Sequence, residues 1–181
     1  MTYLKTYKLS ELYQISSGIS TKACQAGHGY PFCSFSTVFN NRILPDVLPD
    51  LMDTSENDRL KYSIKYGDVL LTRTSETLDE LAMTSVALSD YPNATYSGFT
   101  KRLRPISDSA YPKFMVHFFR SDYFRKIVNN KAIMTLRASF NENIFNDISF
   151  ELPQLSDQIK AGDFLYSIEK KIRNNCTAMI F

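Results

Sequence analysis

The apolar residues of this chain occur in short runs, and this feature limits what the chain can fold into. The longest uncharged apolar runs are of the kind found at residues 69–71 and 114–116, whereas a membrane-spanning helix needs about 20 consecutive apolar residues. A spanning segment is therefore not expected. Hydrophobic residues make up 44% of the 181 residues, which is enough for a core that outweighs the loss of chain entropy. We expect one compact unit built from many short elements.

Turn residues divide the chain into predicted strands and helices. Gly67 and Asp68 break the chain before the aliphatic run 69–72, which predicts a strand there. Apolar residues recur at helical spacing from Phe114 to about Asn129, which predicts a helix. The pattern indicates a mixed α/β (α+β) fold, irregular and rich in β-structure, with packed helices. The remaining expectations are strands at 4–9, 13–16, 31–35, 83–88, 99–103 and 148–152, a loop at 43–57, and a final helix that follows Pro153 and is capped by Ser156 or Asp157.

The final helix carries the apolar spacing of a coiled coil. Leu165, Ile168, Ile172 and Asn175 lie alternately three and four residues apart, which is the a/d register. A seam of barely two heptads is marginal in water, and Gly162 costs about 1 kcal/mol of helix propensity. The helix therefore needs a partner surface. We expect residues 1–153 to form the globular domain and residues 154–181 to begin a helix whose partner contacts Ile159, Leu165, Ile168, Ile172 and Asn175.

Charge is segregated along the chain although the formal net charge is only +2. Residues 46–95 contain ten acidic residues against four basic ones, whereas residues 96–137 contain nine Lys and Arg against two Asp. Aromatic residues are interleaved with the cations of this basic block, residues 96–137. Such a composition is typical of a phosphate-contacting surface, because cations displace counterions and aromatic rings pack or stack. The alternative is a solvated helix face.

Motifs that would indicate catalysis are weak. Cys24, His28 and Cys33 supply three potential soft ligands in one loop, whereas a structural zinc site needs four, so an ordinary turn is the simpler interpretation. An enzyme that uses this loop remains a third interpretation. Glycines near His28 do not complete a dinucleotide fingerprint, and a GK[ST] phosphate loop is absent from the sequence. We expect no metal, no cofactor and no catalytic residue. The first residues lack the apolar stretch of a secretory signal, so we expect a cytoplasmic protein.

Several segments, read in order, resemble a known family. The strongest match is residues 66–74, Tyr-Gly-Asp-Val-Leu-Leu-Thr-Arg-Thr. The other matching segments are residues 9–18, 29–36, 83–87, 150–158 and 168–175. Together these segments resemble a target-recognition domain of the DNA-specificity subunit of type I restriction–modification enzymes.

The resemblance implies a non-catalytic protein that binds double-stranded DNA and directs methyltransferase and restriction subunits to a bipartite site. Family members usually carry two recognition domains separated by long helices, and this chain has one. It departs from the family where residues 75–77 replace a common glycine and where the helix ends at Phe181. These departures favour a half-subunit or a truncated product that pairs through its C-terminal helix, and a homodimer is one such pairing. The alternative function is an assembly protein that binds methyltransferase subunits without sequence-specific DNA reading.

Three sets of residues are the candidate DNA contacts. Arg73, with Thr74 and Ser75, follows a predicted strand and could fork onto guanine or phosphate; its alternative role is a surface ion pair with the acids of residues 76–80. The second set is expected to contact phosphates, with a solvated strand edge as the alternative. It consists of Lys101, Arg102 and Arg104. The third set, in polar loops, consists of Lys22, Arg137 and Ser139.

Overall fold

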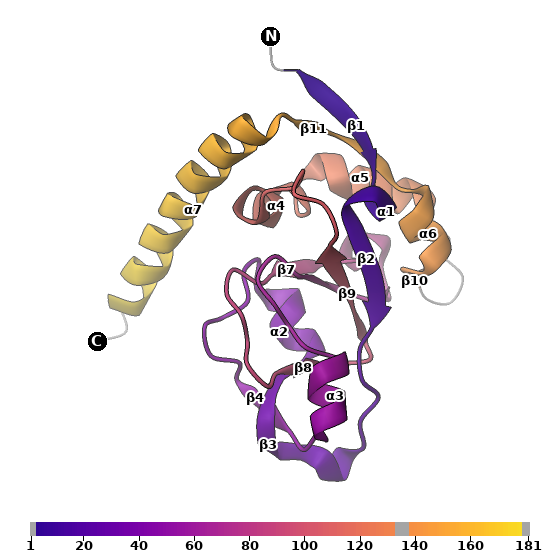
Figure 1. The fold of residues 1–181 in the computed structure, drawn as a ribbon, viewed down its shortest axis with the longest axis vertical. Helices are drawn as coiled ribbons and strands as arrows, with labels where there is room; N and C mark the ends of the chain where they lie inside the picture. The colour runs from indigo at the N-terminus through magenta and orange to yellow at the C-terminus, as the bar shows by residue number, and fades with distance from the viewer. Residues whose placement is uncertain (1–2, 133–137, 179–181) are drawn as a thin grey trace.

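A four-stranded antiparallel sheet lies at the centre of the fold (Figure 1). The computed structural model describes residues 3–132 and 138–178, with only the helix backbone described for residues 173–178. The sheet order is β2-β9-β5-β7. The strands confirm four predicted segments, and their bounds are β2 (Tyr13–Ser17), β9 (Thr100–Pro105), β5 (Val69–Thr72) and β7 (Thr84–Val86).

Strand β5 is buried on both faces and separates two hydrophobic cores. Val69 and Leu71 belong to the larger core, and Leu70 between them belongs to the smaller one. Alternate residues of a strand point to opposite faces of its sheet. A strand covered on both faces therefore reads as a continuous apolar run, which is why its bounds could be predicted from the sequence.

The larger core is closed by a ribbon and by packed helices. β1 (Leu4–Lys8) pairs antiparallel with β11 (Ser149–Pro153), which confirms both predicted strands, although Leu9 begins a helix instead of ending β1. Phe118, Phe119, Phe124 and Phe150 form a cluster of aromatic rings beneath this ribbon. The helices around this core are α1 (Leu9–Leu12), α4 (Pro112–Phe118), α5 (Asp122–Lys131) and α6 (Glu142–Asp147).

The helix expected from Phe114 to Asn129 is two helices, α4 and α5. Ser121 caps α5, because its Oγ accepts a hydrogen bond from the Phe124 N–H at 3.3 Å and donates one to the Phe118 carbonyl at 2.6 Å. Ser is a favoured N-cap residue. The helical spacing of the apolar residues continues across the turn, so periodicity alone could not reveal the break.

The smaller core lies on the other side of the central sheet. Its three-stranded sheet has the order β4-β3-β8, and β8 pairs parallel with β3. The predicted strand at 31–35 corresponds to the end of β3, and the loop predicted at 43–57 is wrong in part, because it contains β4 and the start of α3. The elements here are β3 (Ala26–Cys33), β4 (Asp50–Met52), β8 (Thr95–Tyr96), α2 (Phe35–Asn40), α3 (Glu56–Lys61) and the turn η1 (Ala23–Gln25).

The last helix, α7 (Leu155–Ala178), crosses α4 at close range. A Cβ at Gly162 would lie 2.7 Å from the Phe114 nitrogen, so the glycine permits the approach of the two helices. Gln158 is 1% exposed. Its side-chain oxygen accepts a hydrogen bond from the Tyr111 N–H, and its side-chain nitrogen donates to the carbonyls of Ser109 and Pro153. These bonds anchor the start of α7 to the loop before α4.

The predicted cap of α7 is wrong by one or two residues. The helix begins at Leu155, and the carbonyl of Gln154 accepts hydrogen bonds from the N–H groups of Asp157 and Gln158. Ser156 and Asp157 therefore lie inside the first turn, where the Asp157 carboxylate complements the helix dipole. Within residues 3–132 and 138–178, no helical stretch combines the length and apolarity that a bilayer crossing requires.

Candidate nucleic-acid interface

Arg73 is held by its backbone at one end of the central sheet while its side chain is exposed. Its N–H donates to the Phe99 carbonyl at 2.9 Å, and its carbonyl accepts from the Phe140 N–H at 2.8 Å. Arg73 thus joins the end of β5 to two segments that lie far from it in the sequence. Fixing the backbone on both sides lowers the entropy lost when the side chain binds a ligand.

The residues that follow Arg73 form a short ribbon with a distant segment. β6 (Thr74–Ser75) pairs antiparallel with β10 (Ala138–Ser139), so that Thr74 faces Ser139 across the ribbon. The structure therefore brings Ser139, which the sequence placed in a separate set, next to the set of Arg73, Thr74 and Ser75. Arg137 lies outside the described residues.

Lys101 adds a second cation at the same end of the sheet. Its side chain is buried, with the residue 7% exposed, and its Nζ donates to the Ser17 Oγ at 3.3 Å. Burial lowers the pKa of the Lys101 ammonium, the neighbouring Arg73 cation lowers it further, and Glu142 acts in the opposite direction. A buried ammonium is favourable only with a nearby partner. We call Ser17, Arg73, Thr74, Lys101 and Ser139 the Arg73–Lys101 cluster.

The cations of the Arg73–Lys101 cluster lie outside the ion pairs found among the described residues. The two ion pairs found among the described residues join Arg104 to Asp68 and Lys113 to Asp163. Neither cation of the cluster takes part in them. The cluster has the charge and the hydroxyl groups needed to bind an anionic oxygen.

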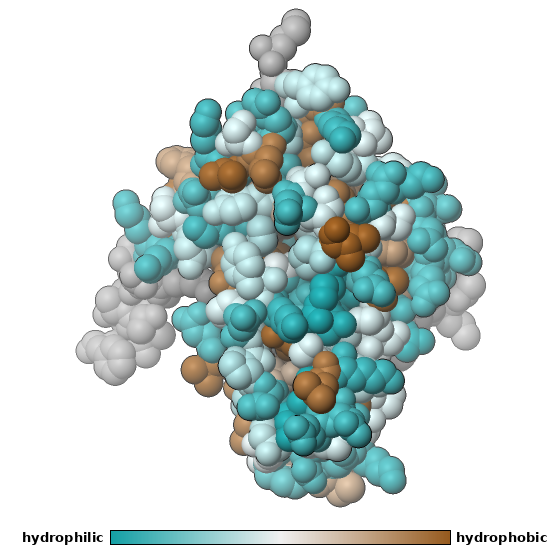
Figure 2. Space-filling model, in the orientation of Figure 1, coloured by the Kyte–Doolittle hydropathy of each residue, from teal (hydrophilic) through white to brown (hydrophobic). Residues whose placement is uncertain are grey.

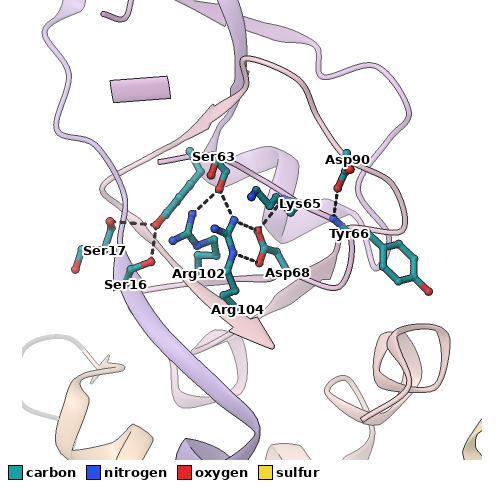
Figure 3. A network of polar contacts seen from close by, with 10 residues as sticks. Ser16, Ser17, Ser63, Lys65, Tyr66, Asp68, Asp90, Arg102 and Arg104 are labelled. Atoms are coloured by element: carbon teal, nitrogen blue, oxygen red, sulfur yellow. Dashed lines mark hydrogen bonds and ion pairs between the residues drawn. The ribbon is translucent and has the colours of Figure 1, made fainter. Parts of the chain in front are cut away.

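Arg102 and Arg104 have partners inside the protein, which corrects their expected role as free phosphate contacts (Figure 3). Arg104 forks onto the buried Asp68 carboxylate at 2.9 and 2.7 Å and also donates to the Ser63 carbonyl at 2.9 Å. Arg102 donates to the same carbonyl and lies over the Tyr96 ring, 5.3 Å from its centroid. Hydrogen bonding to Asp68 raises the pKa of Arg104, whereas burial lowers that of Arg102.

The solvated strand edge considered for these residues is also wrong, because β9 lies between β2 and β5 in the sheet. Arg102 and Arg104 alternate with Lys101 and Leu103 along β9, so the two sets face opposite sides. The Arg102 and Arg104 side chains fix the 63–68 turn to the sheet. The Lys101 side chain faces Ser17 on the other side.

Other cations of the basic block also have internal roles. Arg120 donates to four backbone carbonyls, and Arg125 donates to the carbonyls of Asp79 and Leu78 among others. Lys113 pairs with Asp163 of α7 at 2.7 Å. Lys126 and Lys131 are exposed. The idea that the whole block forms one phosphate-contacting surface is therefore wrong, and neither is the block a simple solvated helix face.

A cleft of about 340 Å³ adjoins the Arg73–Lys101 cluster. On one side, Phe35 and Phe39 of α2 stack with their ring centroids 5.9 Å apart. The other side is formed by β6 and the acidic segment that follows it. Sequence analysis did not identify this cleft, although aromatic residues four apart on one helix were visible. The lining residues are Phe35, Phe39, Thr74, Ser75, Glu76 and Glu80.

Lys22 and the Cys24, His28 and Cys33 loop do not belong to the Arg73–Lys101 cluster. Lys22 is exposed at the start of η1, and its N–H donates to the Gln25 side chain. Cys33 is fully buried, with burial raising the pKa of its thiol, whereas Cys24 is exposed and His28 lies within β3. Among the described residues, no three His, Cys, Asp or Glu side chains are grouped as metal ligands would be.

The predicted partner residues of α7 are partly exposed where they are described. Ile159, Ile168 and Ile172 are 39%, 40% and 54% exposed, and Leu165 is half-buried. The helix extends away from the rest of the molecule towards its C-terminal end (Figure 1). The side chain of Asn175 lies outside the described residues. A partner for this helix stays a prediction.

The face shown in Figure 2 is mainly hydrophilic, and its apolar side chains form small patches separated by polar ones. Proteins seldom use such a surface for an obligate apolar interface.

Comparisons with known proteins identify the family. A family model described as a type I restriction modification DNA specificity domain matches residues 2–178. A comparison with curated protein sequences finds no significant match.

Solved structures show the same fold. A type I restriction–modification S subunit from M. genitalium is similar with a TM-score of 0.67 and 8% identity, over 97% of this chain and 41% of that one. The HsdS subunit from Thermoanaerobacter tengcongensis gives a TM-score of 0.63 and 18% identity, over 97% and 39%. A chain from a structure of complex assembly and conformational transition in the type I R-M system gives 0.63 and 18%, over 97% and 40%.

This chain thus spans about two fifths of the length of these solved chains. Its match to the family model, in contrast, covers nearly all of its own length. The chain belongs to the family of type I restriction modification DNA specificity domains.

Proposed function

We propose that the chain is a DNA-recognition module of a type I restriction–modification system and that it contacts DNA through the Arg73–Lys101 cluster. The observation that carries this proposal is the pair of cations at one sheet end, close to hydroxyl groups and outside the ion pairs of the described residues. Phosphate contacts of this kind set the orientation of a protein on DNA. Arg73 is exposed and can also fork onto guanine.

In this function the chain performs no chemistry of its own. It positions methyltransferase and restriction subunits on a target site in the cytoplasm. Residues 1–153 act as the recognition domain, and residues 154–181 begin the helix that binds a partner. The partly exposed Ile168 and Ile172 on α7 support this division.

We also propose that two copies pair through α7, on which Ile168 and Ile172 are partly exposed. Two-fold symmetry in the protein imposes two-fold symmetry on the DNA, so the target would be a palindrome interrupted by a spacer. A selected site that is contiguous and asymmetric would exclude this pairing.

Random-duplex selection at two salt concentrations tests the function, with and without a methyltransferase subunit of a type I system. We expect an enriched motif that persists at the higher salt. Salt titration of the double variant Arg73→Met/Lys101→Met should lower the slope of log K against log salt by about two, because each phosphate contact contributes roughly 0.9. Lys126→Met, at an exposed position that is not part of the cluster, should leave the slope unchanged.

The second candidate function is an assembly protein whose recognition domain does not read sequence. The exposed apolar positions of α7 favour it as much as they favour the first candidate. Salt-sensitive binding without an enriched motif, together with retention of the methyltransferase subunit, would select this alternative and refute the first. An equal salt slope for the cluster variant and the wild type would refute the assignment of the cluster.

A further inference from the structure

The cleft between α2 and β6 combines an apolar wall with acceptor groups. Phe35 and Phe39 are half-buried and stacked at an interplanar angle of 17°. Glu80 lines the opposite side, and its carboxylate accepts a hydrogen bond from the Ser75 Oγ at 3.5 Å, which is at the outer limit of such a bond. A concave site with mostly apolar walls and a few polar groups is typical of ligand-binding pockets.

The acidic side of the cleft is held rigidly from behind. The turn η2 (Leu78–Glu80) accepts hydrogen bonds from the Arg125 guanidinium at the carbonyls of Leu78 and Asp79. The Thr72 Oγ1 donates to the Glu80 carbonyl at 3.4 Å and accepts from the Met83 N–H at 2.9 Å. These bonds fix the backbone from which the Glu80 side chain projects, and a functional side chain on a rigid support binds its ligand more selectively.

Adjacent carboxylates in this turn serve different purposes. The Asp79 carboxylate accepts a hydrogen bond from Asn129 of α5, so it belongs to the support of the turn. The Glu80 carboxylate lines the cleft with Thr74 and Ser75. The cleft thus receives an acceptor from a turn that the half-buried Arg125 cation and the Asn129 amide stabilise.

A carboxylate beside a phosphate-binding cluster would repel the bound DNA unless the DNA presents a hydrogen-bond donor to it. Arg73 directly precedes Thr74, so DNA bound by the Arg73–Lys101 cluster would bring base edges close to the cleft. In the major groove, the hydrogen-bond donors are the exocyclic amino groups of adenine and cytosine, and a carboxylate can accept a hydrogen bond from either of them. A carboxylate repels phosphates and bases that present only acceptors, which adds discrimination against other sequences.

Resting on the proposed function, we infer that this cleft is a base-reading site, in which the Glu80 carboxylate accepts a hydrogen bond from the exocyclic amino group of adenine or cytosine against the Phe35–Phe39 wall. The aromatic wall contacts the methyl group of a thymine that neighbours the read base in the same groove. The cleft therefore sets which base pair is accepted at one position of each half-site, whereas the Arg73–Lys101 cluster supplies affinity.

The test is random-duplex selection with the full chain and three variants. Glu80→Gln removes the charge but keeps the shape, Phe39→Leu removes the stacked wall, and Glu151→Gln is a matched change at an exposed carboxylate on β11. We expect Glu80→Gln to relax or change the preference at one base pair by roughly 5- to 150-fold. The same position should weaken in Phe39→Leu, and Glu151→Gln should select the wild-type motif.

The outcomes separate the inference from the proposed function. If Glu80→Gln selects the wild-type motif unchanged at every position, the inference is overturned while the proposed function stands. If the wild type enriches no motif, the proposed function itself fails. A change at the affected position from adenine or cytosine to another base identifies which amino group is read. Thermal unfolding of each variant establishes that the compared proteins are folded, and Phe39→Leu provides the second measurement if Glu80→Gln is unstable.

Discussion

Replacement of Arg120 by methionine tests whether the basic block serves the fold. The Arg120 Nε donates to the Thr84 carbonyl at 2.7 Å, and its Nη2 donates at 3.0 Å to each of three carbonyls at the end of α2. The last carbonyls of a helix lack intrahelical partners and are favoured by a cation. The side chain therefore connects α2, β7 and the turn between α4 and α5. The three α2 acceptors belong to Val38, Phe39 and Asn41.

The expected cost follows from these bonds. Each hydrogen bond to a charged group contributes about 1.5–3 kcal/mol, but the four share one cation and are not additive. Burial lowers the pKa of Arg120 to about 10, which shows that desolvation of the cation opposes the gain. We therefore expect Arg120→Met to decrease the free energy of unfolding by about 3 kcal/mol, well below the sum of the four bonds. At this chain length the melting temperature should fall by about 6–12 °C.

Urea and thermal unfolding measured by circular dichroism provide the assay, with Lys126→Met as the matched control. Lys126 is an exposed cation of the same block, so its replacement should change the free energy of unfolding by less than about 0.5 kcal/mol. DNA affinity is then measured at a temperature where both variants are folded. Equal melting temperatures for the two variants, with weaker DNA binding only in Arg120→Met, would refute a structural role for Arg120.

Three further outcomes are expected. Gly162→Ala should destabilise the protein by about 1 kcal/mol in denaturant unfolding. A Cβ 2.7 Å from the Phe114 nitrogen would push α7 away from α4, and this cost exceeds the helix propensity gained. A stabilised variant would contradict this packing. Asp68→Asn should cost about 3–5 kcal/mol in the same assay, since it leaves the Arg104 cation without its carboxylate, and a change below about 1 kcal/mol would argue against the ion pair. Burial lowers the pKa of His117, so stability should fall as the pH drops below about 6.5, where the unfolded chain gains the proton first. Unfolding at pH 7.5 and 5.5 should show a smaller loss for His117→Gln, and an equal loss in both proteins would exclude this histidine.

Local chemistry could be predicted from the sequence where neighbouring residues decide the outcome. The Gly67–Asp68 break and the aliphatic run after it predicted β5 with its bounds, since both faces of the strand are buried and the local turn begins it. The family resemblance rested on such local segments and was confirmed by the family model. The prediction of a single helix from Phe114 was wrong, because Ser121 caps a second helix within a stretch whose apolar spacing is continuous.

The use of the cations depended on the tertiary structure. Lys101, Arg102 and Arg104 have the same charge on one strand, yet β9 directs Arg102 and Arg104 to internal acceptors and Lys101 to the Arg73 side. The partners come from distant parts of the chain: Asp68 and Ser63 on one face, and Ser17 on the other. A sequence shows the charge of a residue and its alternation along a strand, but only the pairing of distant strands decides which charges are neutralised and which remain available to a ligand.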